Sequence, residues 1–168
     1  MTRTLPRPLS PCAVSRLRLL GCLALVALVA VLGSMVTAPA IAGWYQNLAK
    51  PAWTPPNAAF PVAWTVLYLL MAVALWRLWD RAPPGPARRR AIALFLAQLL
   101  LNAAWSPVFF GLHAIIAGLA VILALVAVLA AAVMAAFRAD RIAGALLVPY
   151  LAWVCYASTL NAAIAILN

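Results

Sequence analysis

The most constraining feature of this sequence is a series of long apolar runs separated by short polar segments. Runs of about 18 or more apolar residues are long enough to cross the ~30 Å hydrocarbon core of a bilayer as helices. Of the 168 residues, 68% are hydrophobic and only 8% are charged, whereas soluble domains average about 25% charged. We therefore expect an all-α fold, a single integral membrane bundle of transmembrane helices.

The apolar runs predict five spans, at about residues 19–38, 62–79, 91–110, 114–137 and 142–167. Residues 1–18, rich in proline and arginine, are predicted to form a disordered basic tail. The first span has a second interpretation, because residues 38–40 resemble the cleavage site of a secretory signal peptide. Its apolar run is longer than the about 7–15 residues usual in such peptides, so we interpret it as a retained helix.

The chain has a net charge of +10, from 12 basic and 2 acidic residues. Its arginines lie between apolar spans and are not interleaved with exposed aromatic residues, which argues against nucleic acid as a partner. With the N-terminus inside, every basic residue except Lys50 falls in an inner segment, as the positive-inside rule requires. The sequence thus predicts a multi-pass protein of a bacterial cell membrane, with a cytoplasmic N-terminus and the C-terminus outside.

Polar residues inside a membrane are costly, so their positions are the best indicators of function. Gln98, Asn102 and Ser106 lie four residues apart on one face of the third span, with Trp105 beside them. The second and fifth spans repeat this spacing with aromatic and polar residues: Trp64, Tyr68, Met71 and Leu75, then Tyr150, Trp153, Ala157 and Asn161. For Gln98 and Asn161, hydrogen bonding between helices is an equally simple explanation.

Three spans thus each present tryptophan together with a hydrogen-bonding neighbour. An apolar cavity with a few convergent polar groups is the general form of a small-molecule site, and aromatic walls suit a large flat ligand. Residues 39–61, also rich in tryptophan and proline, are interpreted as a lid over such a site or as an interfacial segment. The span at 114–137 carries no polar side chain and is expected to face lipid or a partner subunit.

Catalysis finds little support in the residue inventory. The chain contains no glutamate, Asp80 and Asp140 lie at inner helix ends, and the single histidine, His113, lies in an outer turn. No acid–base pair, nucleophilic triad or metal cluster can be assembled from these residues. His113 is interpreted as a solvated turn residue, with axial ligation of haem as the alternative. We therefore predict no metal site and no catalytic residues.

Four motifs resemble those of a known family. They are WYQNLAKPAWTPP at 44–56, PVAWTVLY at 61–68, QLLLNAAWSPVFFG at 98–111 and PYLAWVCYASTLN at 149–161. In this order they are similar to the first loop and to helices two, three and five of the tryptophan-rich sensory protein/translocator protein (TspO/MBR) family. The similarity extends over residues 19–168.

The resemblance implies a five-helix bundle, commonly dimeric, that binds porphyrins such as protoporphyrin IX and haem without an obligatory cofactor. It implies a pocket whose positions here are Tyr45, Pro55, Trp64, Tyr68, Asn102, Trp105, Trp153 and Ala157. Some members of the family also bind cholesterol. The tyrosine–basic motif associated with sterols is missing after Asn161, although residues 90–99 fit its inverted form.

Three functions remain open at this stage. The first is a tetrapyrrole-binding sensor or regulator of porphyrin handling that contributes to transport, and the second is a porphyrin carrier. The third is light-dependent porphyrin degradation, in which Trp64 and Trp153 would be the reactive residues.

Small residues at i, i+4 allow close helix contact in lipid, so Ala93 and Ala97 predict a homodimer through the third span. Alanines of the fourth span are the alternative interface: Ala120, Ala124, Ala132 and Ala136.

Overall fold

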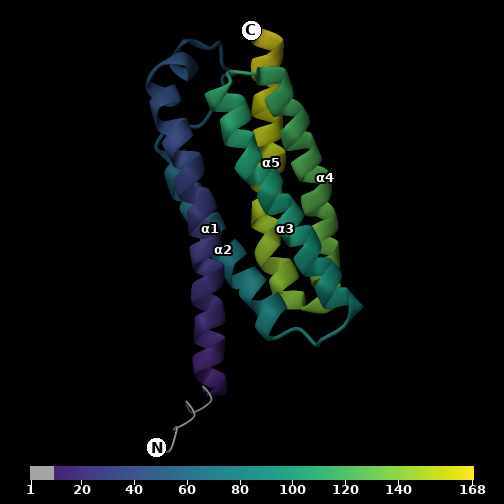
Figure 1. Ribbon diagram of the computed structural model, residues 1–168. Coiled ribbons are helices and arrows are strands. Elements are labelled where there is room, and N and C mark those ends of the chain that lie inside the picture. The colour runs from purple at the N-terminus through teal and green to yellow at the C-terminus, as the bar shows by residue number, and fades with distance from the viewer. Residues whose placement is uncertain (1–9) are drawn as a thin grey trace, which may run out of the picture.

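The computed structural model describes residues 10–168 and contains five long helices (Figure 1). These are α1 (Pro11–Ala42), α2 (Ala59–Asp80), α3 (Pro86–Ser106), α4 (Ile115–Ala139) and α5 (Arg141–Leu167). A 3₁₀ helix, η1 (Trp44–Asn47), follows α1, and a π-helix, η2 (Pro107–Gly111), extends α3. All five helices are long and apolar enough to cross a membrane. The predicted all-α fold of five spans is confirmed.

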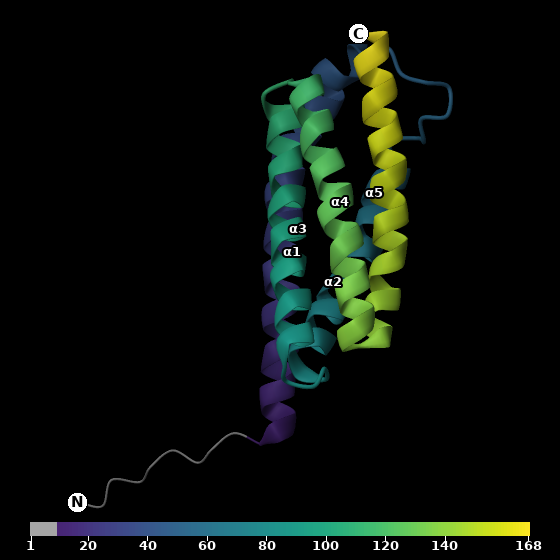
Figure 2. The ribbon, with the colours of Figure 1, turned by 90° about the vertical axis from the view of Figure 1, so that its right-hand side faces the viewer.

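The helices run alternately up and down (Figures 1 and 2), and their contacts arrange them in a ring. α1 packs against α2 and α3, α5 packs against α2 and α4, and α3 packs against α4, so the order around the ring is α1–α2–α5–α4–α3. The long connection between α1 and α2 lies at the same end of the bundle as the C-terminus, which we call the outer end. The turns that precede α3 and α5 lie at the opposite, inner end.

Large apolar side chains on the outside of the ring are exposed, including Leu28, Leu100 and Ile116. Others fill its centre, where Met71, Phe95 and Leu147 are fully buried. A surface this apolar around a packed core is the arrangement expected when lipid surrounds the helices. The protein is an integral membrane protein.

The beginning of α1 corrects one prediction. Residues 11–18 were expected to belong to a disordered tail, but they form the first two turns of α1. Pro11 begins the helix, where its missing N–H costs nothing, and the Ser10 hydroxyl accepts a hydrogen bond from the Ala13 N–H at 3.3 Å. Residues 1–9 of the predicted tail lie outside the described residues.

α4 also differs in part from its prediction. Its entirely apolar composition suggested that it faces lipid or a partner, yet one side is buried against α3 and α5 through Ile122, Leu125 and Leu129. The opposite side, with Ile116 and Leu123, is exposed. The helix is therefore apolar all round because it meets protein on one side and an apolar surrounding on the other.

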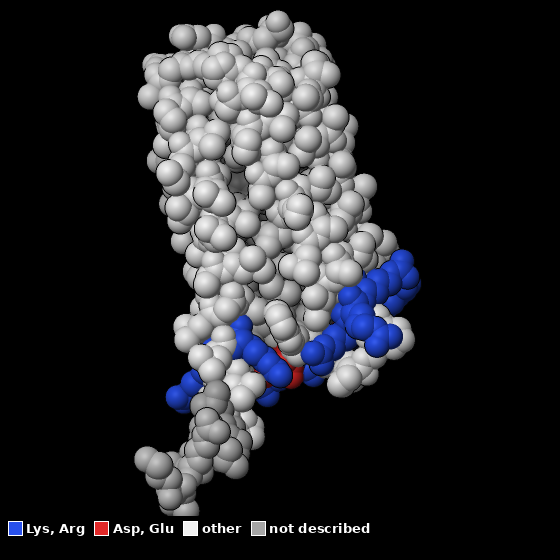
Figure 3. Space-filling view, viewed as in Figure 1, with Lys and Arg blue, Asp and Glu red and all other residues white. Residues whose placement is uncertain are grey.

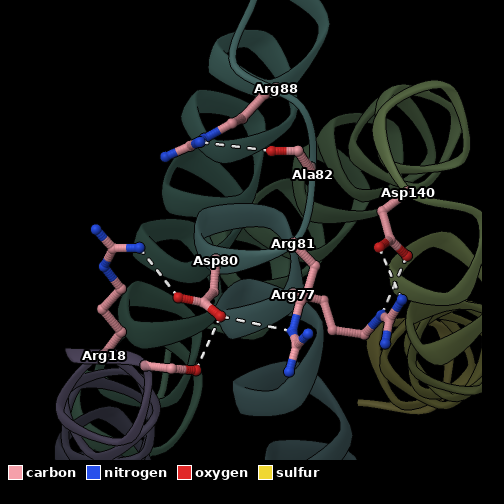
Figure 4. Close-up of polar contacts among 8 residues, drawn as sticks. Arg18, Arg77, Asp80, Arg81, Ala82, Arg88 and Asp140 are labelled. Atoms are coloured by element: carbon pink, nitrogen blue, oxygen red, sulfur yellow. Dashed lines mark hydrogen bonds and ion pairs between the residues drawn. The ribbon is translucent and has the colours of Figure 1, made fainter. Parts of the chain in front are cut away.

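Both acidic residues of the chain form ion pairs at the inner end (Figure 4). Asp80 of α2 accepts hydrogen bonds from Ser15 (2.8 Å) and Arg18 (3.0 Å) of α1. Arg77, one turn earlier on α2, holds Asp140 in a bidentate pair, with N–O distances of 3.1 and 2.9 Å. α2 is thus bound on one side to α1 and on the other to the start of α5.

Asp140 has a second role as the N-cap of α5, because its Oδ1 accepts the Ala143 N–H at 2.7 Å. Burial by itself opposes ionisation of this carboxyl, but the hydrogen bonds from Arg77 and Ala143 outweigh it and lower the pKa of Asp140 below its ordinary value. The residue is therefore an anion at neutral pH. The arginines around it gather at the inner end of the molecule (Figure 3).

Candidate functional site

A cavity of about 570 Å³ lies inside the outer part of the bundle. It is lined by α1, α2, α3, η2 and α5, and by Tyr45 of η1 and Asn57 of the following loop at the outer end. Its volume falls within the range of about 300–1,000 Å³ usual for small-molecule sites. The wall contributed by α1 consists of small residues such as Ala30, Gly33 and Thr37, which leave the space open.

A chain of hydrogen bonds connects the cavity wall to the centre of the bundle. The Tyr68 hydroxyl donates to Asn102 Oδ1 at 2.9 Å, and Asn102 Nδ2 donates to the Tyr150 hydroxyl at 2.8 Å. Tyr68 and Asn102 line the cavity, whereas Tyr150 is fully buried behind them. Three helices are joined through one amide, which fixes the polar groups that a ligand would meet.

Trp105 and η2 form an aromatic wall. Trp105 stacks on Phe109 with ring centroids 5.2 Å apart, and Phe110 meets Trp105 edge-on at 5.6 Å. Pro107 explains the local geometry: it has no N–H, so the backbone bonds shift to the π spacing, with Leu112 N–H donating to the Pro107 carbonyl at 2.9 Å. The wider turn directs Phe109 and Phe110 toward the interior, where both are buried.

Asn161 of α5 holds this wall in place. Its Oδ1 accepts the Trp105 indole N–H at 3.3 Å, and its Nδ2 donates to the Ile115 carbonyl at the start of α4, at 3.1 Å. The interhelical explanation of Asn161 is thus correct, and Asn161 also lines the cavity. Gln98 is different: it is fully buried, and neither polar atom of its side chain has a partner among the described residues.

Trp64 and Trp153 contribute the remaining aromatic walls. Trp64 stacks on Tyr68, with centroids 5.3 Å apart, and Phe60 meets Trp153 edge-on at 6.0 Å. Trp153 also borders an apolar groove on the outer surface between α2 and α5. Its ring therefore separates the cavity from the exterior on that side.

The segment between α1 and α2 covers the outer end of the cavity. Tyr45 is buried there against Phe110, with centroids 5.5 Å apart. Lys50 organises the turn, because its ammonium donates to the carbonyls of Tyr45 (2.8 Å), Gln46 (3.1 Å) and Leu48 (3.0 Å). Burial, followed by the nearby Tyr156, raises the pKa of Tyr45 above its ordinary value, so its hydroxyl stays neutral.

Two contacts fasten this segment to α5, beside which it runs in Figure 2. The Asn168 amide forms two hydrogen bonds of 3.0 Å with the backbone of Ala49, one as acceptor and one as donor. The Tyr156 hydroxyl donates to the Trp53 carbonyl at 2.8 Å. The segment therefore lies over the cavity as a lid held by neutral hydrogen bonds.

The structure brings together most of the residues predicted for the site. All of them line the cavity except Pro55, which lies in the lid segment away from the cavity wall: Tyr45, Trp64, Tyr68, Asn102, Trp105, Trp153 and Ala157. The sequence-based prediction missed the contributions of Phe109, Phe110 and Asn57, and the small residues of α1. His113 does not line the cavity; its ring stacks on Trp44 with centroids 4.4 Å apart.

The comparisons with known proteins agree with this architecture. A tryptophan-rich sensory protein of Cereibacter sphaeroides is 44% identical over 118 residues, or 70% of this chain and 72% of the relative. The tryptophan-rich protein TspO of Archaeoglobus fulgidus is 38% identical over 152 residues, covering 90% of this chain and 97% of the relative. The human translocator protein is 35% identical over 121 residues, or 70% of each chain.

The family assignment follows from the fold, the motifs and these relatives together. Residues 22–167, from the fourth turn of α1 to the end of α5, match the model of a single family, which covers the helices and the lid. The chain belongs to the TspO/MBR family.

Proposed function

We propose that this protein binds a tetrapyrrole, such as protoporphyrin IX or haem, in the cavity and that it senses or regulates porphyrin handling in the membrane. The observation that carries this proposal is the convergence of Trp64, Trp105 and Trp153, from three helices, on one cavity. Stacking on an aromatic face contributes about 0.5–1.5 kcal/mol beyond the burial of area. A relative named as a sensory protein supports a sensing role.

The test is an absorbance titration of the purified protein in lipid nanodiscs with protoporphyrin IX. We expect saturable binding with a shifted Soret band, and a loss of affinity of about threefold to tenfold for each of Trp64→Phe, Trp105→Phe and Trp153→Phe. Trp79→Phe is the matched control, since Trp79 is an exposed residue of α2 outside the cavity. Equal effects of all four variants, or no saturable binding, would contradict the proposal.

Light-dependent porphyrin degradation is a second candidate, favoured by the position of Trp64 and Trp153 on the same cavity. In the same samples, illumination should bleach the bound pigment faster than free pigment, and Trp64→Phe should slow the bleaching at saturating pigment. Bleaching that is independent of both tryptophans would assign the reaction to the pigment alone. A porphyrin carrier would instead move pigment across proteoliposome membranes.

We also propose that the inner end faces the cytoplasm of a bacterial cell. Arg77, Arg81 and Arg138 lie at this end, as do Arg88, Arg89 and Arg90 at the start of α3, whereas Lys50 lies at the outer end. This asymmetry is that of the positive-inside rule. Reporter fusions at residues 84 and 168 should fall in opposite compartments, and finding both in one compartment would contradict the orientation.

A further inference from the structure

The described residues that line the cavity are all uncharged, and their polar groups are amides, hydroxyls and indole N–H groups. Of these, the Trp153 indole N–H has no partner among the described residues, but it is a single neutral donor. Several of these groups are already engaged within the protein: Tyr68 and Asn102 bond to each other, and Asn161 bonds to Trp105 and Ile115. The inner floor is apolar, formed by Leu23, Val26 and Ala72. These groups leave little capacity to compensate a buried anion.

The nearest cations at both ends of the cavity are committed to other partners. At the outer end, Lys50 lies behind Tyr45, and its ammonium donates to three backbone carbonyls. At the inner end, beyond the cavity floor, Arg18 pairs with Asp80 and Arg77 pairs with Asp140. Pairing a ligand carboxylate with Lys50 or Arg77 would break contacts that hold the lid or the helices, and Arg18 is already paired beyond the apolar floor.

A porphyrin such as protoporphyrin IX has its two carboxylates on one edge and apolar substituents on the opposite edge. Burying a carboxylate without a partner carries a large desolvation cost. Several residues that line the cavity are exposed: Ala27, Ser34, Thr65 and Leu69 lie along membrane-spanning helices, whereas Asn57 and Pro61 lie at the outer rim. The opening at this rim is the one that faces water. A carboxylate placed there keeps its contact with water.

We infer that the cavity takes the macrocycle with its apolar edge first, leaving both carboxylates at the outer rim beside Asn57, so that the ligand's charge adds nothing to affinity. This inference rests on the proposed tetrapyrrole function and specifies the orientation of the ligand in that site. The affinity then arises from the aromatic walls and the apolar floor.

The experiment compares protoporphyrin IX with its dimethyl ester, which keeps the macrocycle but removes both charges. In nanodiscs of neutral lipid at neutral pH, we expect the two dissociation constants to agree within about threefold and to change little with salt. Free acid that binds about tenfold or more tighter than the ester would show that a cation pairs with the carboxylates, which overturns the inference and leaves the function standing. Failure of both pigments to bind would overturn the function itself.

Variants at the rim test the orientation directly. Asn57→Lys adds a cation beside the expected carboxylates, so it should raise the affinity for the free acid by about twofold to fivefold, as an exposed ion pair does, without changing that for the ester. Asn47→Lys is the matched control, because it adds the same charge at an exposed residue of η1 that does not line the cavity, and it should leave both affinities unchanged. An Asn57→Lys variant that gives no gain for the free acid contradicts placement of the carboxylates at this rim.

Discussion

Replacing Asn102 by leucine should destabilise the bundle more than a change of one cavity residue ordinarily does. Leucine has a similar size and fits the helix, so the main change is the loss of the amide between Tyr68 and Tyr150. The two tyrosines are affected differently. Tyr68 borders the cavity and can find a new partner there, whereas the Tyr150 hydroxyl is fully buried and loses the hydrogen bond it accepts.

The expected magnitude follows from these two bonds. Side-chain hydrogen bonds between membrane helices contribute about 0.6 kcal/mol each on average. Leaving a buried hydroxyl without a partner costs a further 1–3 kcal/mol or so. We therefore expect Asn102→Leu to lower the free energy of unfolding by about 2–4 kcal/mol.

Reversible unfolding in mixed micelles with increasing SDS, followed by circular dichroism, measures this quantity. Tyr150→Phe provides the second arm of a double-mutant cycle, since phenylalanine removes the buried hydroxyl that Asn102→Leu would strand. In the Tyr150→Phe background, Asn102→Leu should cost about 1–2 kcal/mol less than in the parent. A coupling free energy near zero would refute the reasoning, because the two side chains would then act independently.

Three further predictions concern the site, the inner end and the subunit contact. Ala157→Thr adds a branched side chain on the cavity wall and should weaken protoporphyrin IX binding while the melting temperature stays unchanged; unchanged affinity with a lower melting temperature would assign Ala157 to helix packing alone. Because the pKa of Asp140 is lowered in the folded protein, the stability it contributes is present above its unfolded pKa and is lost as the pH falls through the folded value. Between about pH 5 and about pH 3, the melting temperature of Asp140→Asn, which keeps a capping side chain, should therefore fall less than that of the parent protein. An identical fall in both proteins would contradict this. Ala93 and Ala97 lie on an exposed face of α3, so Ala97→Leu should shift chemically cross-linked dimer toward monomer. Ala120→Leu on α4 is the control. An effect seen only with Ala120→Leu would place the interface on α4 and not on α3.

The number of spans and the principal site residues could be predicted because both depend on local patterns. An apolar run long enough to cross a bilayer has few alternatives to a helix, and the spacing of Trp64 and Tyr68 places both on one face. The start of α1 could not be placed from polarity, since a helix continues past the apolar region wherever its cap and its long side chains allow. Ser10 supplies the cap, and Arg16 and Arg18 extend from the helix near its N-terminus.

The missed site residues have a different origin. Phe109 and Phe110 lie beyond Pro107, where the π-helical turn changes the register, so the spacing that begins at Gln98 no longer applies. Gly33 and Ala30 line the cavity by being small, and smallness leaves no distinctive pattern in an apolar run. The pairs of Asp80 and Asp140 join residues about 60 positions apart, with sequence separations of 62 and 63, which no local pattern can reveal.

The ion pairs at the inner end have a mechanical consequence for the cavity at the other end. Ionic contacts join α1 to α2 near Arg18, while the outer end of α1 continues into the lid and its neutral hydrogen bonds. The helix between Arg18 and Ile41 is roughly 35 Å long at 1.5 Å per residue, so a small tilt of α1 about the ion pair would produce a large displacement of its outer end. A tilt of α1 by about 5° about the ion pair would displace its outer end by about 3 Å, close to the thickness of an aromatic ring. The contacts at the ion pair itself would barely change.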